Sequence, residues 1–343
     1  MAQRVRIRDI ADELGLSTAT VSNVIHGKTQ KVSDATVRRV QALLEQRQYI
    51  PSMAGILLAQ NASCIVGVFV NDHEKYEGHV LSDAFIASSL DHLATALEEG
   101  GQFMMVKKAQ RAEEVLQFAS MWNMDGLVVI GFCHQDYQFL RDHMRIPFVV
   151  YDGFCSRPER IVDLTIDNFD GGRQVGALLR RLGHRRALCV ADNCVGVDEE
   201  RVAGFAAAFG ETETLLVPMH AAQRRVFYRE QLPRLRAVTA VFAVSDFYAA
   251  DLMQFLAEAG LRVPDDLSVV GFDDSPLSTL VHPALTTVRQ DGAQRARLAV
   301  DMLRRLRAGE TVEPVVRLPV SLVERGSTGP CGEESSKMHK KLP

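Results

Sequence analysis

The first sixty positions contain three stretches in which apolar residues recur at helical spacing. The first stretch has the i, i+3, i+4, i+7 spacing of a short amphipathic helix, with Ile7, Ile10, Ala11 and Leu14. Gly15 then suits the left-handed turn that ends a helix, and Ser17 suits the cap of a second helix over about 18–25. Ser33 is placed to cap a third helix. This order predicts a small all-α helix-turn-helix headpiece over residues 1–49.

From residue 63 to residue 328 the pattern changes to short apolar runs separated by helical stretches. Ile65–Val70, Leu127–Ile130 and Ala187–Val190 are typical of the apolar runs. Strands that alternate with helices in this way predict parallel sheets covered by helices on both faces. Because about 265 residues are more than one such sheet needs, we expect an α/β architecture with two Rossmann-like lobes.

Charge is distributed unevenly between these two regions. Residues 1–60 contain eight Lys and Arg against five Asp and Glu, whereas the whole chain has a formal net charge of -4. A basic head on an acidic body is expected where only the head contacts phosphate. The distribution therefore favours nucleic-acid binding by the headpiece.

The outward side chains around the predicted second helix are short and polar, as a helix in the major groove requires. Asparagine can pair with adenine through two hydrogen bonds, and alanine or the threonine methyl can contact the methyl group of thymine. The candidates for reading bases are Thr18, Ala19 and Asn23. Hydroxyl groups can donate to phosphate oxygens and so fix the register on DNA. The candidates for that role are Thr20, Ser22 and Ser33.

The sequence shows no sign of a catalytic centre, a metal site or a bound cofactor. The six cysteines are scattered without a Cys-x-x-Cys pair, which is typical of free thiols in a reducing compartment. A dinucleotide loop of the form Gly-x-Gly-x-x-Gly and a Gly-x-Ser-x-Gly nucleophile elbow are both missing. We therefore expect a protein that is not an enzyme and that needs no cofactor.

The amino-terminal residues and the hydropathy of the chain favour the cytoplasm. Residues 1–6 lead into a charged helix without the apolar segment of a secretory signal. No stretch approaches the length of about 18 apolar residues that a membrane span needs. We expect a cytoplasmic protein that does not contact a membrane.

Several motifs of the first sixty residues together resemble the headpiece of the LacI/GalR family of bacterial transcriptional regulators. They are Ile7-Arg8-Asp9-Ile10-Ala11, Gly15-Leu16-Ser17-Thr18-Ala19-Thr20-Val21-Ser22, Val32-Ser33 and Tyr49-Ile50-Pro51. The run from Pro51 to Leu58 resembles the hinge helix of that family, within a linker over residues 50–62. The resemblance implies that the DNA-binding set also contains Ser17, His26, Tyr49, Ala54 and Leu57.

Leu57 matches the family's hinge leucine, which wedges between base steps in the minor groove at the operator dyad. Two positions of the hinge depart from the family pattern. Ser52 stands where the family usually has Asn, and Gly55 stands where it usually has Arg. Glycine lowers helix propensity by about 1 kcal/mol, so we expect weaker hinge folding or a different operator centre.

The larger region resembles the periplasmic-binding-protein-like core of the same family. The motifs are Asp167-Asn168 with Gly171-Gly172, Arg201-Val202-Ala203-Gly204-Phe205, Val263-Pro264-Asp265-Asp266 and Gly271-Phe272-Asp273-Asp274. The resemblance implies an effector-binding and dimerisation domain over residues 63–328. Its N-lobe is expected to span about 63–161 and 291–318, and its C-lobe about 162–290 and 319–328. The Gly, Ser, Lys and Glu content of residues 329–343 predicts a disordered tail.

The resemblance places a small-molecule effector between the two lobes, at the carboxyl ends of the strands. The matching effector-binding candidates are Asn71, Asp72, Asp170, Arg201, Ser245, Asp246 and Asp273. An arginine and a carboxylate suit the hydroxyl groups of a polyol, so a sugar or sugar derivative is expected. The loop over residues 71–87 diverges most from the family, and it either borders the effector or is plain surface.

These features predict a homodimeric repressor that binds a pseudo-palindromic double-stranded operator and responds to a small-molecule effector. Two alternatives remain open at this point. The first is a DNA-binding regulator that has an altered or lost effector response, given Ser245 and the divergent loop. The second is a solute-binding protein, which would need a secretory signal and has no use for a basic head.

Overall fold

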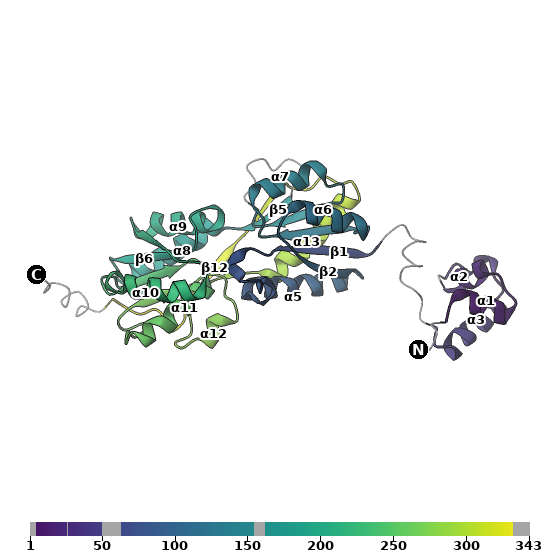
Figure 1. The fold of residues 1–343 in the computed structure, drawn as a ribbon, viewed down its shortest axis with the longest axis horizontal. Coiled ribbons are helices and arrows are strands. Elements are labelled where there is room, and N and C mark those ends of the chain that lie inside the picture. The colour runs from purple at the N-terminus through teal and green to yellow at the C-terminus, as the bar shows by residue number, and fades with distance from the viewer. Residues whose placement is uncertain (1–4, 26, 50–62, 154–161, 332–343) are drawn as a thin grey trace, which may run out of the picture. The chain divides into compact units, whose positions relative to one another are not determined.

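The computed structural model describes residues 5–25, 27–49, 63–153 and 162–331. The chain divides into two compact units, a headpiece unit up to Cys64 and a body that begins at Ile65. The headpiece helices are α1 (Ile7–Leu14), α2 (Thr18–Ile25) and α3 (Asp34–Gln46), with a 3-10 turn η1 (Thr29–Lys31) before α3 (Figure 1). The three predicted helices of the headpiece are confirmed.

Local capping fixes the boundaries of the headpiece helices. Gly15 ends α1 in the left-handed conformation with a φ of 65°. The Ser17 hydroxyl accepts from the backbone N–H of Thr20 at 3.1 Å, and the Ser33 hydroxyl accepts from that of Thr36 at 3.3 Å. The three helices enclose a small core of Ile10, Ala11, Val21, Val24, Val40 and Leu43.

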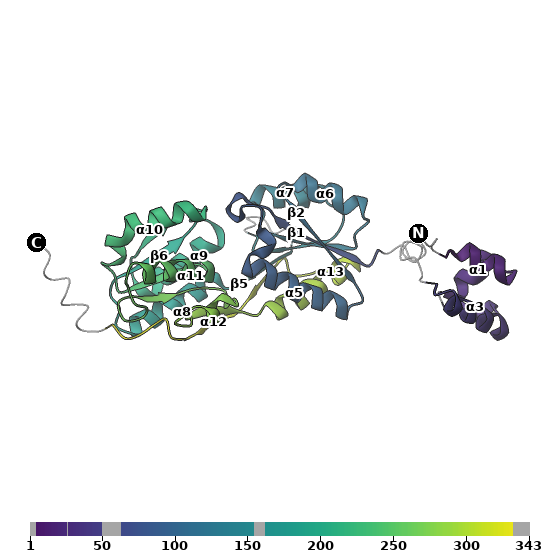
Figure 2. The ribbon, with the colours of Figure 1, turned by 60° about the horizontal axis from the view of Figure 1, so that its bottom comes forward.

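The first lobe of the body, the N-lobe, contains a six-stranded parallel sheet in the order β11-β5-β4-β3-β1-β2. Its strands are β1 (Ile65–Asn71), β2 (Phe103–Ala109), β3 (Gly126–Ile130), β4 (Phe148–Tyr151), β5 (Val162–Ile166) and β11 (Val315–Leu318). Helices α5 (Ala84–Glu99) and α13 (Gly292–Arg307) cover one face, and α6 (Ala112–Met121) and α7 (His134–His143) cover the other (Figure 2). Apolar side chains fill both faces, as expected for a sheet buried on both sides.

The second lobe, the C-lobe, contains a four-stranded parallel sheet in the order β7-β6-β8-β9. Its strands are β6 (Ala187–Ala191), β7 (Glu213–Leu216), β8 (Ala240–Ala243) and β9 (Ser268–Val270). Helices α8 (Asn168–Arg181) and α9 (Gly196–Phe209) lie on one face, and α10 (Ala221–Leu235) and α11 (Asp246–Glu258) lie on the other. A short helix α12 (Leu277–Leu280) follows β9, and β10 (Thr287–Gln290) pairs antiparallel with β12 (Val320–Val323).

The boundary expected between the lobes at residues 161 and 162 is wrong. Strand β5 belongs to the N-lobe sheet, where Val149 of β4 pairs with Val162 and Val315 of β11 pairs with Asp163. The chain therefore enters the C-lobe only after Ile166. The sequence pattern identifies 162–166 as apolar, but it does not show which sheet pairs with that strand.

The expected start of the tail at Gly329 is also wrong. The Gly329 N–H donates to the Ser268 hydroxyl at 3.1 Å, and the Cys331 N–H donates to the Leu182 carbonyl at 2.8 Å. The backbone of residues 329–331 is thus fixed to the C-lobe by hydrogen bonds that composition does not reveal. The rest of the expected tail, residues 332–343, lies outside the described residues.

Helices α8 and α9 pack closely where the first turns of α8 meet the middle of α9. A Cβ atom built on Gly172 would lie 1.9 Å from the Arg201 carbonyl oxygen, and one built on Gly204 would lie 1.9 Å from the Phe169 carbonyl oxygen. Only glycine fits at either position without a backbone shift. This reciprocal contact positions Arg201, on α9, directly against the start of α8.

The described residues contain neither a membrane-spanning helix nor a cluster of metal-ligating side chains. None of the helices in the described ranges is both long and apolar enough to cross a membrane. No group of three or more His, Cys, Asp or Glu within those ranges is arranged to hold a metal ion.

Candidate functional site

The headpiece presents its predicted base-reading side chains to solvent. Thr18, Ala19 and Asn23 are exposed on α2, while Val21 and Val24 on the same helix are buried. The carboxamide of Asn23 forms no hydrogen bond with the described residues, so its donor and acceptor are available to a ligand. One face of α2 therefore holds the helix in place and the other remains available for contact.

The predicted phosphate-binding hydroxyls lie at the helix starts or on α2. The hydroxyls of Ser17 and Thr20 are 2.9 Å apart. Ser33 is exposed at the start of α3, and Ser22 is half-buried on α2. Tyr49 packs partly buried against the headpiece core. The other DNA-binding candidates, His26, Ala54 and Leu57, lie outside the described residues.

Some basic side chains of the headpiece are neutralised and others are not. Arg47 pairs with Glu13 at 2.7 Å, and Arg8 lies 3.7 Å from Asp12. Within the described ranges, no ion pair joins Lys28, Lys31 or Arg38 to an acid. These exposed cations give the headpiece the positive field that attracts a phosphate backbone.

In the body, the two lobes face each other around Arg201, a residue with almost no exposure to solvent. Its Nε donates to the Asn168 side-chain oxygen at 2.9 Å, and its Nη1 donates to the Val244 carbonyl at 2.6 Å. Its guanidinium carbon lies 3.8 Å from the centre of the Phe272 ring. Its Nη2 has no hydrogen-bond partner among the described residues, so this nitrogen is available to a ligand.

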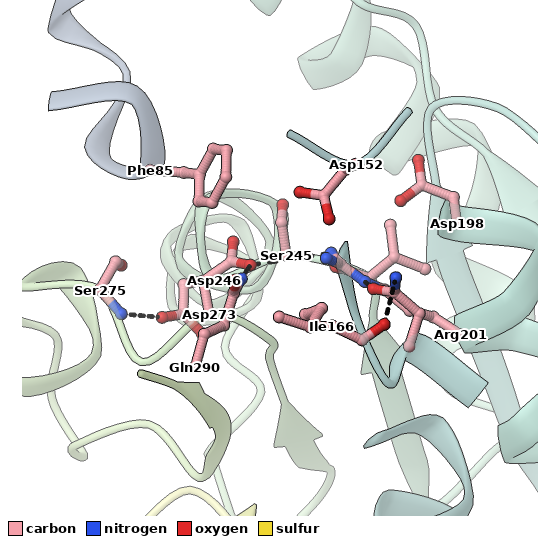
Figure 3. Close-up of polar contacts among 12 residues, drawn as sticks. Phe85, Asp152, Ile166, Asp198, Arg201, Ser245, Asp246, Asp273, Ser275 and Gln290 are labelled. Carbon is pink, nitrogen blue, oxygen red and sulfur yellow. Dashed lines mark hydrogen bonds and ion pairs between the residues drawn. The ribbon is translucent and has the colours of Figure 1, made fainter. Parts of the chain in front are cut away.

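Asp273, another effector-binding candidate, forms a charged pair with Arg201. Its Oδ1 lies 3.7 Å from the Arg201 Nη1 and accepts from the Gln290 side-chain amide at 2.7 Å. Burial raises the pKa of Asp273 well above its usual value, and Asp246 and Asp83 raise it further, while Arg201 opposes them. Phe85 of α5 points toward this group from the N-lobe (Figure 3).

Asp246 and Ser245, both predicted to bind the effector, also form hydrogen bonds within the protein. Asp246 is only 1% exposed, and its two carboxylate oxygens accept from the Ser275 N–H at 2.7 Å and from the Thr287 hydroxyl at 2.5 Å. Burial raises the pKa of Asp246 to about 6 despite these bonds. The Ser245 hydroxyl accepts from the Tyr248 N–H at the start of α11. Asp246 therefore braces the loop after β9 through both of its carboxylate oxygens.

Asp170 does not join the group around Arg201. Its two carboxylate oxygens accept from Arg173 at 2.8 Å and from Gln174 at 2.7 Å, both on the same helix. The hydrogen bond from Gln174 leads the effects that lower the pKa of Asp170. Asp170 lies on the first turn of α8 and matches the family motif, but its carboxylate forms hydrogen bonds with residues of its own helix.

Asn71 and Asp72 lie at the carboxyl end of β1, as predicted. The Asp72 Oδ2 pairs with the Lys108 ammonium at 3.0 Å, while its buried Oδ1 accepts no hydrogen bond in the described part of the chain. Asn71 is half-buried and pairs in register with Ala109. Both residues are therefore at the sheet edge where a ligand is expected.

The structure adds polar residues that sequence reasoning missed. Asp152 follows β4, and its Oδ1 accepts from the Arg295 guanidinium at 2.8 Å and from the Thr165 hydroxyl at 3.1 Å. Asp198 lies with Asp152 beside Arg201 (Figure 3). Burial raises the pKa of Asp198 to about 6, although Arg201 opposes the shift.

A simple signal would have found some of the missed residues. Asp152 and Asp192 directly follow the buried strands β4 and β6, so they lie at the carboxyl ends where open sheets bind ligands. Asn168 follows the capping residue of α8 but gives no signal of its contact with Arg201. Lys75, in the divergent loop, gives none either, because its partner Asp192 is 117 positions away.

The arrangement around Arg201 suits recognition of a polar ligand. One oxygen each of Asp83, Asp152, Asp198 and Asp273 accepts no hydrogen bond in the described ranges and can accept from hydroxyl groups. Arg201 and Ser245 supply donors to the same space. These are the groups that bind a sugar-like ligand, and no activated nucleophile appears among them.

Comparison with protein families matches two parts of the chain. Residues 6–52 match the family described as bacterial regulatory proteins, lacI family. Residues 177–328 match the periplasmic binding protein-like domain. These two matches cover the helix-turn-helix and most of the C-lobe.

Characterised proteins resemble the chain along nearly its whole length. The HTH-type transcriptional regulator CelR of Thermobifida fusca is 30% identical over 336 residues, covering 91% of this chain and 95% of CelR. The HTH-type transcriptional repressor PurR of Erwinia tasmaniensis is 28% identical over 342 residues, covering 94% and 96% of the two chains. Both relatives are regulators of transcription by name.

Solved structures also resemble the chain along nearly its whole length. A lac repressor dimer bound to operator and the anti-inducer ONPF has a TM-score of 0.81 and 25% identity, covering 95% of this chain and 100% of that chain. A CelR–cellobiose complex has a TM-score of 0.68 and 26% identity, covering 94% and 100%. With its helix-turn-helix, its two parallel-sheet lobes and these end-to-end likenesses, the chain belongs to the LacI family of bacterial transcriptional regulators.

Proposed function

We propose that this LacI-family member is a homodimeric repressor in the bacterial cytoplasm, without catalytic activity of its own. Its headpieces bind the two halves of a pseudo-palindromic operator, and a sugar or sugar derivative between the lobes controls that binding. The observation that carries the proposal is the exposed polar face of α2, where the Asn23 carboxamide forms no hydrogen bond with the part of the chain that the structure describes.

Support for the DNA-binding half comes from the headpiece and from a relative. The base-reading set is Thr18, Ala19 and Asn23, and the phosphate-binding set is Thr20, Ser22 and Ser33. Ser17 is a further proposed DNA contact, from the resemblance. We keep His26, Tyr49, Ala54 and Leu57 as proposed DNA contacts from the resemblance. The similar lac repressor is a dimer bound to operator, and a two-fold dimer matches a two-fold operator.

Support for the effector half comes from the polar groups between the lobes. Arg201 and Asp273 form a charged pair in which one nitrogen and one oxygen have no hydrogen-bond partner among the described residues. Asn71 and Asp72 lie at the facing sheet edge. The similar CelR is solved with cellobiose. An effector that binds one lobe arrangement more tightly shifts the population toward it and so changes operator affinity.

Selection from a random double-stranded DNA library tests the DNA-binding half. The full chain should enrich a pseudo-palindrome over random competitor. Asn23→Ala should change the base preference at one position in each half-site, at about 1–3 kcal/mol of discrimination. Ser33→Gly removes a hydroxyl but lowers helix capping by only a few tenths of a kcal/mol, so it should weaken all sites equally. No enriched palindrome, or the same effect of both variants, would contradict the proposal.

A thermal-shift screen tests the effector half. The full chain is heated with sugars, sugar phosphates and nucleosides, and a sugar at about 100 times its Kd should stabilise the body by about 2.7 kcal/mol. A stabilising sugar should then change operator affinity in the DNA-binding assay. Stabilisation by nucleosides alone would overturn the sugar assignment but not the effector site.

A further inference from the structure

The loop between β1 and α5, residues 72–83, crosses from one lobe toward the other, and we call it the strap. Its base is fixed to the N-lobe, because the Lys108 ammonium binds the Asp72 carboxylate at 3.0 Å and the Gly78 carbonyl at 2.9 Å. At its end, Asp83 accepts from the N–H groups of Phe85 and Ile86 and caps α5. The strap is therefore fixed to the N-lobe near both of its ends.

Two side chains of the strap reach the C-lobe. The Lys75 ammonium lies 3.3 Å from the Asp192 Oδ2, at the carboxyl end of β6. The Glu77 carboxylate lies 3.2 Å from the His220 ring at the start of α10. The His220 hydrogen bond leads the effects that lower the pKa of Glu77, and the backbone N–H of Ala221 adds to it. The strap therefore contacts the C-lobe at two separate places, Asp192 and His220.

The Lys75 contact is more than a surface ion pair. Asp192 has a side chain only 2% exposed, and its Oδ2 also accepts from the Tyr248 hydroxyl at 2.9 Å. Burial alone would raise the pKa of Asp192, but Lys75 and Tyr248 together hold it below its usual value. Salt screens a pair of this kind much less than a surface pair, and removal of Lys75 would leave a buried carboxylate without its cation.

The same carboxylate is linked to the group around Arg201. The Asn193 side-chain amide donates to the Asp192 Oδ1 at 2.8 Å and to the Asp198 Oδ2 at 2.7 Å. Asp198 in turn interacts with Arg201. Hydrogen bonds and an ion pair thus connect Lys75 to Asp198, and the charge of Arg201 acts on that carboxylate.

We propose that Lys75 is a positioning residue of the effector site, which holds the two lobes together through Asp192 before any effector binds. This inference rests on the proposed function. The effector then binds beside Lys75, among Asp83, Arg201 and Asp273, and does not replace it. Because the lobes are already held together, the effector gains affinity from the larger fraction of binding-competent protein.

Amide hydrogen exchange of the ligand-free full chain tests the strap without an effector or DNA. In Lys75→Met, exchange in the strap and in residues 192–198 should rise about tenfold, since the contact between the lobes is lost. Lys75→Arg should restore most of the protection, because a cation again faces Asp192. Glu74→Gln is the matched control, since Glu74 is exposed on the strap and its side chain has no partner among the described residues.

Effector affinity provides the second readout, using whichever sugar the thermal-shift screen identifies. Lys75→Met should weaken its binding about tenfold, and Lys75→Arg and Glu74→Gln should bind within about twofold of the original chain. Unchanged exchange in Lys75→Met, or unchanged or tighter sugar binding with faster exchange, would overturn the positioning role. If none of the sugars, sugar phosphates and nucleosides binds, the effector proposal and this role fail together, while faster exchange would still show that Lys75 joins the lobes.

Discussion

In the headpiece, the polar side chains proposed to contact DNA come from one short stretch and lie in solvent. Thr18, Ala19 and Asn23 belong to a single helix and are exposed. Around Arg201, the polar groups come from helices and strands far apart in the chain, and Arg201 itself is 6% exposed. One region keeps its donors and acceptors free, while the other satisfies most of them within the protein.

The contrast follows from the ligand that each region is proposed to bind. A duplex is large and already charged, so a protein can meet it with an exposed surface whose side chains are free to adjust. A small molecule must be enclosed, which requires charges to be buried and therefore paired. Headpiece variants should accordingly change binding more than folding, whereas variants near Arg201 should change both.

The largest effect is expected from Arg201→Met. This change removes the donors to Asn168 and Val244 and leaves the buried Asp273 without its cation, which should destabilise the body by about 3–5 kcal/mol. Urea unfolding followed by tryptophan fluorescence reports the body alone, because Trp122 is the single tryptophan of the chain. Arg173→Met, at an exposed pair on α8, should stay within about 0.5 kcal/mol of the original. If the two variants lowered the free energy of unfolding equally, the interpretation that buried Arg201 stabilises the body would be contradicted.

A pH-dependent effect of intermediate size is expected from Asp163→Asn in the N-lobe. Burial raises the pKa of Asp163 to about 7, and the neighbouring Asp152 adds to the shift. The folded state therefore holds a proton that the unfolded state releases above about pH 4, so this contribution to stability is present at low pH and lost as pH rises through about 7. The asparagine side chain that replaces Asp163 in the variant does not titrate.

Its stability relative to the original chain should therefore increase by about 2 kcal/mol between pH 5 and pH 8. Urea unfolding at both pH values, again followed by Trp122, measures this difference. Other titrating groups cancel in the comparison because both chains contain them. A constant difference between the two chains across this range would show that Asp163 is ionised in the folded protein throughout.

The smallest effect is expected from Ser17→Ala in the headpiece. The loss of the hydroxyl that accepts from the Thr20 N–H should lower the local stability of α2 by about 1 kcal/mol. Amide exchange of α2 in the full chain measures this change. Ser22→Ala on the same helix removes a hydroxyl that caps nothing, so protection there should remain the same. A loss of protection throughout the body would show that the two units do not fold independently.

Local signals predicted the headpiece closely. Gly15, Ser17 and Ser33 lie where the helices end and begin, because turns and caps depend on neighbouring residues only. The family motifs named Arg201 and Asp273 as separate effector contacts, and the structure places them 3.7 Å apart. Asp170 and Asp246 matched motifs equally well, but each of their carboxylate oxygens already accepts a hydrogen bond within the protein.

The sequence by itself determined the helix-turn-helix, the strand–helix alternation of the body and the family to which the chain belongs. Only the tertiary structure decided that β5 completes the N-lobe sheet, that Asn168 holds Arg201 and that Lys75 meets Asp192 across the lobes. The physical reason is that helical periodicity and capping act over a few residues. The partner of a buried strand or charge is selected by packing, which brings together residues more than a hundred positions apart.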